Sequence, residues 1–344
     1  MRTIVLTGGG TAGHVLPHIA LLPFLRQDFD RIIYLGGNGV EREIAQESGI
    51  PFYGVTTVKL RRKLTLKNLA IPFRLLKGIG EAKKILRELK PDVVFSKGGF
   101  VALPVVYAAA SLGIKVIAHE SDMSLGLANR MSAKKCSMIA TTFPIIDQRY
   151  SNLVQTGAII RSSVYHGDAS RIASPHNGLP KVLVVGGSLG ATAINEAVAQ
   201  ALPELCRHYN VLHVTGRGKA VTRSAPPNYQ QVEYLSNPAD AFAWADVVVA
   251  RAGSGTVSEL LALHKPTIYI PLPKTESRGD QIQNANYLQN LGVGVMLPQA
   301  ELTTERLLTT LDQVYQNRKT ITENCAKQTW IDGTAKILNY LRQS

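Results

Sequence analysis

The sequence is poor in cysteine, and its three cysteines, Cys136, Cys206 and Cys325, are widely spaced. This spacing is typical neither of a disulfide framework nor of a zinc site, so free thiols in a reducing compartment are expected. The sequence also has no apolar run near the ~20 residues that span a bilayer. No leader pattern precedes its first expected strand. We therefore expect a cytosolic protein, or one attached to a membrane from the cytosolic side.

The composition is that of a folded protein with more than one core. The chain has 344 residues, of which 45% are hydrophobic and 18% are charged. This length favours two globular domains, each with enough apolar residues for its own core. The net charge is +13, and residues 1–158 hold 21 Lys and Arg against 11 Asp and Glu. A basic first half indicates an anionic partner: a nucleic acid, an anionic membrane or a polyphosphate ligand.

Much of the positive charge lies in residues 59–90, where eleven Lys and Arg face only Glu81 and Glu88. Leucine, isoleucine and phenylalanine alternate with these charges, which suits an anionic membrane surface. An amphipathic helix packed on a sheet explains part of the same pattern, above all Ile85, Leu86 and Leu89. No known RNA- or DNA-binding signature accompanies the charge, so no nucleic acid partner is expected.

Short apolar strands run into glycines at two places about half the chain apart. Residues 4–7 lead into Gly8, and residues 182–185 lead into Gly186. Further strands are expected at residues 32–35, 93–95, 116–118, 138–140, 211–214, 231–234, 247–249 and 267–270. Continuous β-branched runs that alternate with helices predict parallel sheets buried on both faces. We expect a linker at residues 157–180 and helix from about residue 303 to residue 341.

Three glycine loops follow expected strands, at residues 8–14, 98–100 and 186–191. Glycine lets backbone N–H groups approach a ligand closely, and the helix that follows adds partial positive charge. The spacing is neither that of the dinucleotide fingerprint nor that of the lysine-bearing P-loop. Each loop taken alone also fits a purely structural turn.

The fourth loop is the most specific one, running from Arg251 to Glu259 after an expected strand. Residues 253–256 would begin a helix and offer amides and hydroxyls to a diphosphate. Glu259 on that helix could hold a vicinal diol through two hydrogen bonds. A capping box, with Thr256 as the cap and Glu259 three residues later, explains the same residues structurally.

Six motifs in order resemble those of the MurG family of peptidoglycan N-acetylglucosaminyltransferases. They are Gly-Gly-Thr-x-Gly-His at 9–14, His-Glu at 119–120, Gly-Leu-x-Asn at 126–129, Gly-Gly-Ser-x-Gly-Ala at 186–191, Gly-x-x-Thr-Val-Ser-Glu at 253–259, and Asp280-Gln281 with Asn284. The resemblance covers essentially the whole chain. It implies an α/β protein of the GT-B fold, with two Rossmann-like, doubly wound parallel-sheet domains facing a cleft. Residues 1–160 would bind the acceptor and the membrane, and residues 161–344 the UDP-sugar. The last helix, about 318–344, would pack back on the first domain.

The family's reaction is also implied by the resemblance. N-acetylglucosamine would move from UDP-N-acetylglucosamine to the C4 hydroxyl of undecaprenyl-pyrophosphoryl-muramyl-pentapeptide, with inversion at the anomeric carbon. The nucleotide sugar is a substrate, and neither a cofactor nor a metal is expected. The enzyme would lie peripherally on the cytoplasmic face of the membrane.

The resemblance further assigns roles to single residues. His14 is the expected general base, with Glu120 as the rival. Acceptor contacts are expected from Gly98, Gly99, His119 and Asn129. Donor contacts are expected from Thr11, Ala12, Gly13, Arg161, Ser188, Leu235, Ser254, Gly255, Thr256, Glu259, Asp280 and Gln281.

The chain departs from the better-known family pattern directly after His-Glu. That pattern has Gln-Asn, whereas this chain has Ser121-Asp122. An ionised aspartate cannot donate a hydrogen bond as asparagine does, and it would repel a diphosphate. The role of Asp122 is therefore left open.

Other functions fit parts of the sequence. A diacylglycerol glycosyltransferase or a UDP-N-acetylglucosamine epimerase would share the fold, although His-Glu and Gly-Leu-x-Asn weigh against the diacylglycerol enzyme. Release of UDP that depends on a lipid acceptor would argue against the epimerase. A non-enzymatic nucleotide- or nucleic-acid-binding protein would bind its ligand without turnover.

Overall fold

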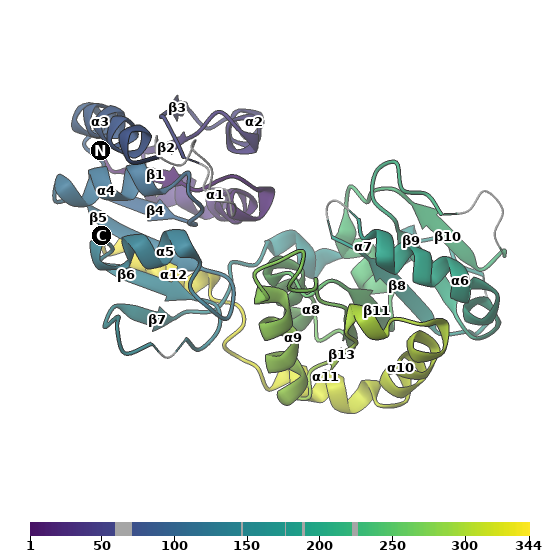
Figure 1. Cartoon of the computed structure of the whole chain (residues 1–344). Coiled ribbons are helices and arrows are strands. Elements are labelled where there is room, and N and C mark those ends of the chain that lie inside the picture. The colour runs from purple at the N-terminus through teal and green to yellow at the C-terminus, as the bar shows by residue number, and fades with distance from the viewer. Residues whose placement is uncertain (59–70, 146, 176, 188–189, 222–225) are drawn as a thin grey trace. The chain divides into compact units, whose positions relative to one another are not determined.

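The chain folds into two compact units in a computed structural model that describes residues 1–58, 71–145, 147–175, 177–187, 190–221 and 226–344. The first unit consists of Met1–Arg161 together with Asp332–Ser344, and the second consists of Ser162–Ile331. Each unit has its own sheet (Figure 1).

The first unit is built on a parallel sheet. Its strands are β1 (Thr3–Thr7), β2 (Arg31–Gly36), β3 (Phe52–Gly54), β4 (Val93–Ser96), β5 (Lys115–Glu120), β6 (Met138–Thr141) and β7 (Leu153–Gln155). Within the described residues these strands lie in the order β3-β2-β1-β4-β5-β6-β7, and each pairing is parallel. This is the Rossmann order, which reverses beside β1.

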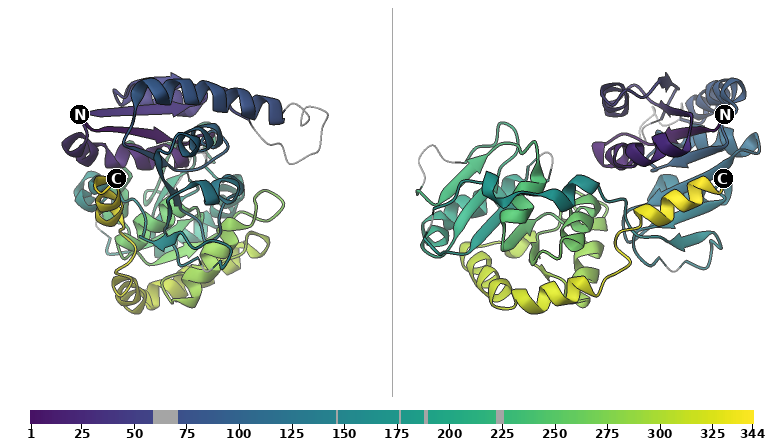
Figure 2. Two further views of the ribbon diagram at one scale, coloured as in Figure 1. Left: turned by 90° about the vertical axis from the view of Figure 1, so that its left-hand side faces the viewer. Right: turned by 180° about the vertical axis from the view of Figure 1, so that it is seen from behind.

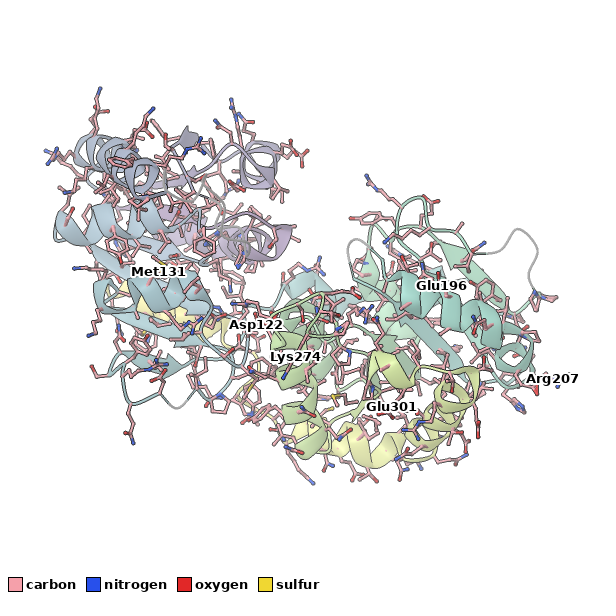
Figure 3. The ribbon with its side chains drawn as sticks, in the orientation of Figure 1. Asp122, Met131, Glu196, Arg207, Lys274 and Glu301 are labelled. Atoms are coloured by element: carbon pink, nitrogen blue, oxygen red, sulfur yellow. The ribbon has the colours of Figure 1, made fainter. Side chains whose placement is uncertain are left out.

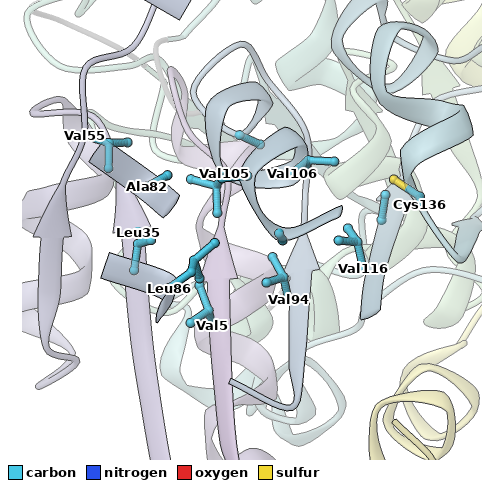
Figure 4. Close-up of a cluster of buried hydrophobic side chains, with 14 of the residues drawn as sticks. Val5, Leu35, Val55, Ala82, Leu86, Val94, Val105, Val106, Val116 and Cys136 are labelled. Carbon is cyan, nitrogen blue, oxygen red and sulfur yellow. The ribbon is translucent and has the colours of Figure 1, made fainter. Parts of the chain in front are cut away.

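Helices cover both faces of this sheet because consecutive residues of each strand point to opposite sides. The helices are α1 (Leu16–Asp28), α2 (Val40–Glu47), α3 (Ile71–Leu89), α4 (Leu103–Ser111), α5 (Leu127–Ser132) and α12 (Thr334–Arg342). Val5 and Leu35 pack with Leu86 of α3 and Val105 of α4 on one face (Figure 4). The other face packs on α1 and α12. Among helices of the described residues, none combines the length and the apolar character needed to cross a bilayer.

The C-terminal helix belongs to the first unit, where Ile337 and Leu341 of α12 share a core with Ile4 of β1 (yellow helix in Figure 2). Arg342 Nε also donates to a carboxylate oxygen of Asp28 at 2.8 Å. The single helix expected at about 318–344 is wrong. It is divided into α11 (Arg318–Ala326), in the second unit, and α12. Between them the chain passes so close to the first unit's backbone that only glycine fits at position 333.

The second unit repeats the same plan. Its strands are β8 (Lys181–Val185), β9 (Asn210–Val214), β10 (Tyr229–Val232), β11 (Val247–Ala250), β12 (Thr267–Tyr269) and β13 (Val295–Met296). Its helices are α6 (Thr192–His208), α7 (Pro238–Trp244), α8 (Ser254–Ala262), α9 (Asp280–Asn290), α10 (Thr304–Gln316) and α11. The described strands lie in the order β10-β9-β8-β11-β12-β13, again with parallel pairings and a reversal beside the first strand.

Residues 162–175 and 177–180, expected to form a linker, are part of the second unit. Short 3-10 turns at Ser162–His166 and Ala169–Arg171 pack on α7. The backbone N–H of Asp168 donates to the Asp240 carboxylate at 2.8 Å. The weak periodicity of this segment reflects its 3-10 turns rather than a free connection.

All ten expected strands are present, but the run at 231–234 begins and ends two residues earlier, as β10. Three strands were not expected: β3, β7 and β13. Each of these three lies at an edge of its sheet.

A buried histidine anchors the glycine loop of the second unit. His213 on β9 is fully buried. Its Nδ1 lies 2.9 Å from the Tyr229 hydroxyl, and its Nε2 lies 3.0 Å from the side-chain oxygen of Asn195. The side-chain amide nitrogen of Asn195 donates in turn to the backbone carbonyl of Thr215 at 2.9 Å. The glycine loop packs on that carbonyl through Gly190, where a side chain would clash. Burial lowers the pKa of His213 to about 4, so the ring is neutral in the folded protein.

We predict that acid destabilises the second unit through His213. Its folded pKa lies below its ordinary value, so its contribution is complete above about pH 6.5 and is lost as the pH falls toward about 4. Between about pH 7 and about pH 5 the loss amounts to roughly 2 kcal/mol. Both tryptophans, Trp244 and Trp330, lie in the second unit, so urea unfolding followed by tryptophan fluorescence reports on it.

The His213→Gln variant should lose most of this pH dependence, whereas His208→Gln, at an exposed histidine of α6, should keep it. An equal pH dependence in both variants would contradict the assignment.

Candidate functional site

The first glycine loop joins β1 to α1 and carries His14. His14 lies at the end of a 3-10 turn, is half-buried, and has its Nδ1 3.1 Å from the Thr11 hydroxyl. The loop after β4 packs directly against it. A Cβ on Gly99 would meet the Gly9 carbonyl at 2.5 Å and His14 Nδ1 at 3.5 Å, and Gly99 has a φ of +76°. Only glycine therefore allows the two loops to meet here.

A buried carboxylate that the sequence analysis missed fixes this loop. Glu41 is 1% exposed and accepts a hydrogen bond from the Gly10 backbone N–H at 3.1 Å. A Cβ on Gly9 would meet its carboxyl carbon at 2.6 Å, and one on Gly37 a carboxyl oxygen at 2.9 Å. Glu41 also lies in the first turn of α2, where helix amides favour negative charge. The glycines at 36, 37 and 39 were the signal that a side chain needed this space.

The end of β5 is organised by Glu120, which is 6% exposed. One carboxylate oxygen accepts from the backbone N–H groups of Ser121 at 3.0 Å and Asp122 at 3.2 Å. The other accepts from the Gly126 N–H at 2.7 Å and the Asn129 amide at 2.9 Å. These four donors tie the loop after β5 and the start of α5 to one side chain.

The residues expected to contact the acceptor lie together in the first unit. Asn129 links α5 to Glu120. A Cβ on Gly98 would lie 2.9 Å from the side-chain oxygen Oδ1 of Asn129. His119 is 1% exposed, and its Nε2 donates to the Gly157 carbonyl at 3.0 Å. Asp122 lies on the loop after β5 (Figure 3).

Lys97 was also missed. It directly follows β4, is 3% exposed, donates to the Ser121 hydroxyl at 2.7 Å and pairs with His119 Nδ1. Burial lowers the pKa of Lys97 to about 7, while the charges of Glu120 and Asp122 raise it. Burial and the nearby Lys97 charge lower the pKa of His119 well below its ordinary value, so His119 is neutral.

In the second unit, the loop after β11 leads into the N-terminus of α8. The helix begins after Gly253, and Val257 makes the first backbone bond to the Gly253 carbonyl at 3.0 Å. The capping box is wrong: Thr256 lies inside the helix, and among the described residues no side chain caps it. The N–H groups of residues 254–256 therefore point along the helix axis at its positive end. Glu259, half-buried, lies one turn further along.

Helix α9 brings the expected donor residue Gln281 and the motif residue Asn284 toward the start of α8. The side-chain oxygen of Gln281 accepts from the Leu272 backbone N–H at 3.0 Å. The side-chain nitrogen of Gln281 lies 3.7 Å from the position that a Cβ would take on Gly253. Asn284 donates to the Ala252 carbonyl at 3.1 Å. Asp280 begins α9 and forms a 3.8 Å ion pair with Arg278.

Of three further expected donor residues, one lies in a different unit from the one expected, and one lies outside the described residues. Leu235 is half-buried on the segment between β10 and α7. Arg161 is the last residue of the first unit before the chain enters the second, rather than a residue of the donor unit. Ser188 lies outside the described residues.

The order of the strands explains why the candidate site residues of each unit lie together. In the first unit the loops after β1, β4 and β5 lie at the carboxyl edge of three adjacent strands, and α1 and α4 leave toward opposite faces of the sheet. In the second unit the loops after β8 and β11 lie beside each other in the same way. Open α/β sheets bind their ligands where the strand order reverses.

Comparison with known proteins agrees with this arrangement. Residues 4–141 match the glycosyltransferase family 28 N-terminal domain, and residues 181–338 match its C-terminal domain. The chain is 42% identical to the UDP-N-acetylglucosamine–N-acetylmuramyl-(pentapeptide) pyrophosphoryl-undecaprenol N-acetylglucosamine transferase of Lachnospira eligens, over 100% of this chain and 99% of that protein. It is 41% identical to the transferase of the same name from Clostridium kluyveri, over the same shares of the two chains.

A solved structure, that of Acinetobacter baumannii MurG, matches with a TM-score of 0.81 and 27% identity over 100% of both chains. The chain belongs to the MurG family. The expected α/β class with two Rossmann-like domains, characteristic of GT-B transferases, is confirmed.

In this MurG-family chain we predict that Glu120 is required for the first unit's stability. Glu120→Gln keeps the shape but replaces one acceptor oxygen by a donor, so two of the four donors lose their partner. We expect a loss of about 1–3 kcal/mol in unfolding free energy. His14→Gln, at a half-exposed position, should stay within about 0.5 kcal/mol of the parent.

Hydrogen exchange of the 119–132 segment, together with urea unfolding by circular dichroism, measures both variants. Equal protection in the two variants would show that Glu120 does not hold this loop.

Proposed function

We propose that this chain transfers N-acetylglucosamine from UDP-N-acetylglucosamine to the C4 hydroxyl of undecaprenyl-pyrophosphoryl-muramyl-pentapeptide, the step that converts lipid I to lipid II. The full-length likeness to transferases named for these substrates carries the proposal. The transfer proceeds with inversion and needs neither a cofactor nor a metal ion. The first unit binds the acceptor, and the second binds the nucleotide sugar.

The first unit supports His14 as the general base rather than Glu120. The Glu120 carboxylate already accepts four hydrogen bonds, which occupy both of its oxygens and hold it against the loop after β5. His14 is half-buried, and histidine's ordinary pKa of about 6.5 suits proton uptake near neutrality. Nδ1 faces the Thr11 hydroxyl, so in the tautomer that donates from Nδ1 the Nε2 lone pair takes the acceptor proton.

The second unit supports binding of the leaving diphosphate. Charge that develops on UDP is stabilised by the N–H groups at the start of α8. The side-chain oxygen of Gln281 is held by the Leu272 backbone N–H. The side-chain nitrogen of Gln281 therefore lies near the N-terminus of α8, where it can donate to sugar hydroxyls. Glu259 holds the ribose hydroxyls.

We predict that the purified protein transfers label from UDP-N-acetylglucosamine to a short-chain analogue of the muramyl-pentapeptide lipid in the presence of a chelator. His14→Ala should lower kcat by about 10²- to 10⁴-fold, because proton transfer is lost. Its affinity for UDP should change little, because His14 lies in the first unit. His166→Ala, at an exposed histidine of the second unit, is the matched control.

Each outcome decides a different part of the proposal. Absence of transfer with UDP still bound would keep the donor site and exclude this acceptor. Release of UDP without the lipid would favour an epimerase. Activity lost to the chelator and restored by a divalent cation would contradict the metal-free reaction, and normal turnover by His14→Ala would contradict the base assignment.

We further propose that α3 attaches the enzyme peripherally to an anionic membrane, on its cytoplasmic face. Residues 59–70 of the basic segment lie outside the described residues. In the rest, Ala82, Leu86 and Leu89 pack in the core, as an amphipathic helix should. The first turns differ, because Phe73 is 76% exposed and Leu76 66% exposed, beside the basic side chains of α3. Exposed apolar side chains among cations suit an anionic lipid surface.

The Phe73→Ser, Leu76→Ser double variant should bind vesicles containing phosphatidylglycerol at least about tenfold more weakly, because two apolar side chains no longer enter the lipid. Cosedimentation measures this, with phosphatidylcholine vesicles as the neutral reference. Tyr165→Ser, which removes an exposed aromatic side chain from the second unit, is the control. Equal binding of all three proteins would exclude α3 as the attachment site.

A further inference from the structure

Lys97 links the ends of two neighbouring strands in the first unit. Its ammonium group donates to the Ser121 hydroxyl at 2.7 Å and pairs with His119 Nδ1. His119 is able to accept this hydrogen bond because its Nε2 donates to the Gly157 carbonyl at 3.0 Å. A lysine that is 3% exposed and held on two sides has a fixed position.

The segment that Lys97 holds carries two carboxylates. Asp122 follows Ser121 directly, and its backbone N–H donates to Glu120 at 3.2 Å. Glu120 is satisfied by four donors, but Asp122 adds a second negative charge at an edge proposed to bind a diphosphate substrate. A carboxylate without a compensating charge at this edge would repel a diphosphate.

The charges around the ammonium are consistent with a pairing to Asp122. The titratable groups around it are His119, Glu120 and Asp122 on and after β5, and His18 on α1. Burial lowers the pKa values of both histidines well below their ordinary values, so they carry no charge. Burial lowers the pKa of Lys97 to about 7, and the two carboxylates act against this. A bound diphosphate would favour the ammonium form further.

We propose that Lys97 is a positioning residue whose ammonium group compensates Asp122, so that the Ser121-Asp122 turn can lie beside a diphosphate. This inference deepens the proposed function and rests on it. It accounts for the departure from the Gln-Asn pattern, because an uncharged asparagine needs no counter-charge, whereas an aspartate does. Lys97 and Asp122 are then one functional unit, and the effect of changing one depends on the other.

A double-mutant cycle tests this coupling. Lys97→Met, Asp122→Asn and the double variant are compared with the parent in the transfer assay, with separate KM values for the lipid acceptor and for UDP-N-acetylglucosamine. Lys97→Met alone should raise the KM of the diphosphate substrate that meets this edge by about tenfold or more, with a smaller effect on kcat. The substrate whose KM rises identifies which diphosphate binds there.

In the Asp122→Asn background, the same Lys97→Met change should raise that KM by less than about threefold. An equal effect in both backgrounds would overturn the proposal, since it would make Lys97 a structural residue only. Lys134→Met removes an exposed lysine from the same unit and should be neutral in both backgrounds.

Lys97→Gln separates charge from hydrogen bonding and replaces Lys97→Met if that variant does not fold. Glutamine still donates to Ser121 but carries no charge. It should therefore restore a normal KM only together with Asp122→Asn. A normal KM for Lys97→Gln beside the native Asp122 would contradict a role for the charge.

A measurement without turnover keeps this inference distinct from the proposed function. NMR of the lysine Cε signals follows the titration of Lys97 in the full chain, and Asp122→Asn should lower its pKa. An unchanged titration would exclude the pairing even in an active enzyme. A lowered pKa in a protein that transfers no sugar would leave the pair intact and reject the proposed reaction.

Discussion

The parallel direction of adjacent strands determines where each unit can bind a ligand. Because β1, β4 and β5 run the same way side by side, their carboxyl ends meet at one edge. The helices after β1 and β4 leave toward opposite faces, so in the part of the chain that the structure describes neither of them covers the edge between these strands. The loops after β1 and β5 are fixed by hydrogen bonds to single buried side chains. Glu41 holds the first loop and Glu120 the third.

The sequence pattern predicted all the central strands of each sheet, but it missed or displaced the edge strands. Central strands are buried on both faces, so they appear as continuous β-branched runs such as Val247–Ala250. The three strands missed, β3, β7 and β13, are short edge strands with partly exposed residues. Their pairing depends on a neighbour already in place, which no local pattern records. The same cause explains the two-residue displacement of β10, the remaining edge strand.

The motifs located the candidate site, but they did not reveal how it is held together. Glycine positions and His-Glu were readable because they are local. Glu41 contacts Gly10 from thirty-one residues away, and Lys97 contacts Ser121 from twenty-four residues away. Such contacts exist only after the strands have been ordered. The sequence could not show the four donors that surround the Glu120 carboxylate. The hydrogen bonds of its carboxylate identify it as the residue that holds the loop.

The discontinuity of the first unit has a consequence for how the chain is made. Ile337 and Leu341 of α12 belong to the same core as Ile4, yet the whole second unit is translated between them. As the chain leaves the ribosome, the second unit is the first whose segments are all available. Until α12 is made, one face of the amino-terminal sheet is covered by α1 but not by α12. A ribosome that stops early therefore releases a chain whose first unit lacks α12 and leaves apolar side chains of that core exposed to water.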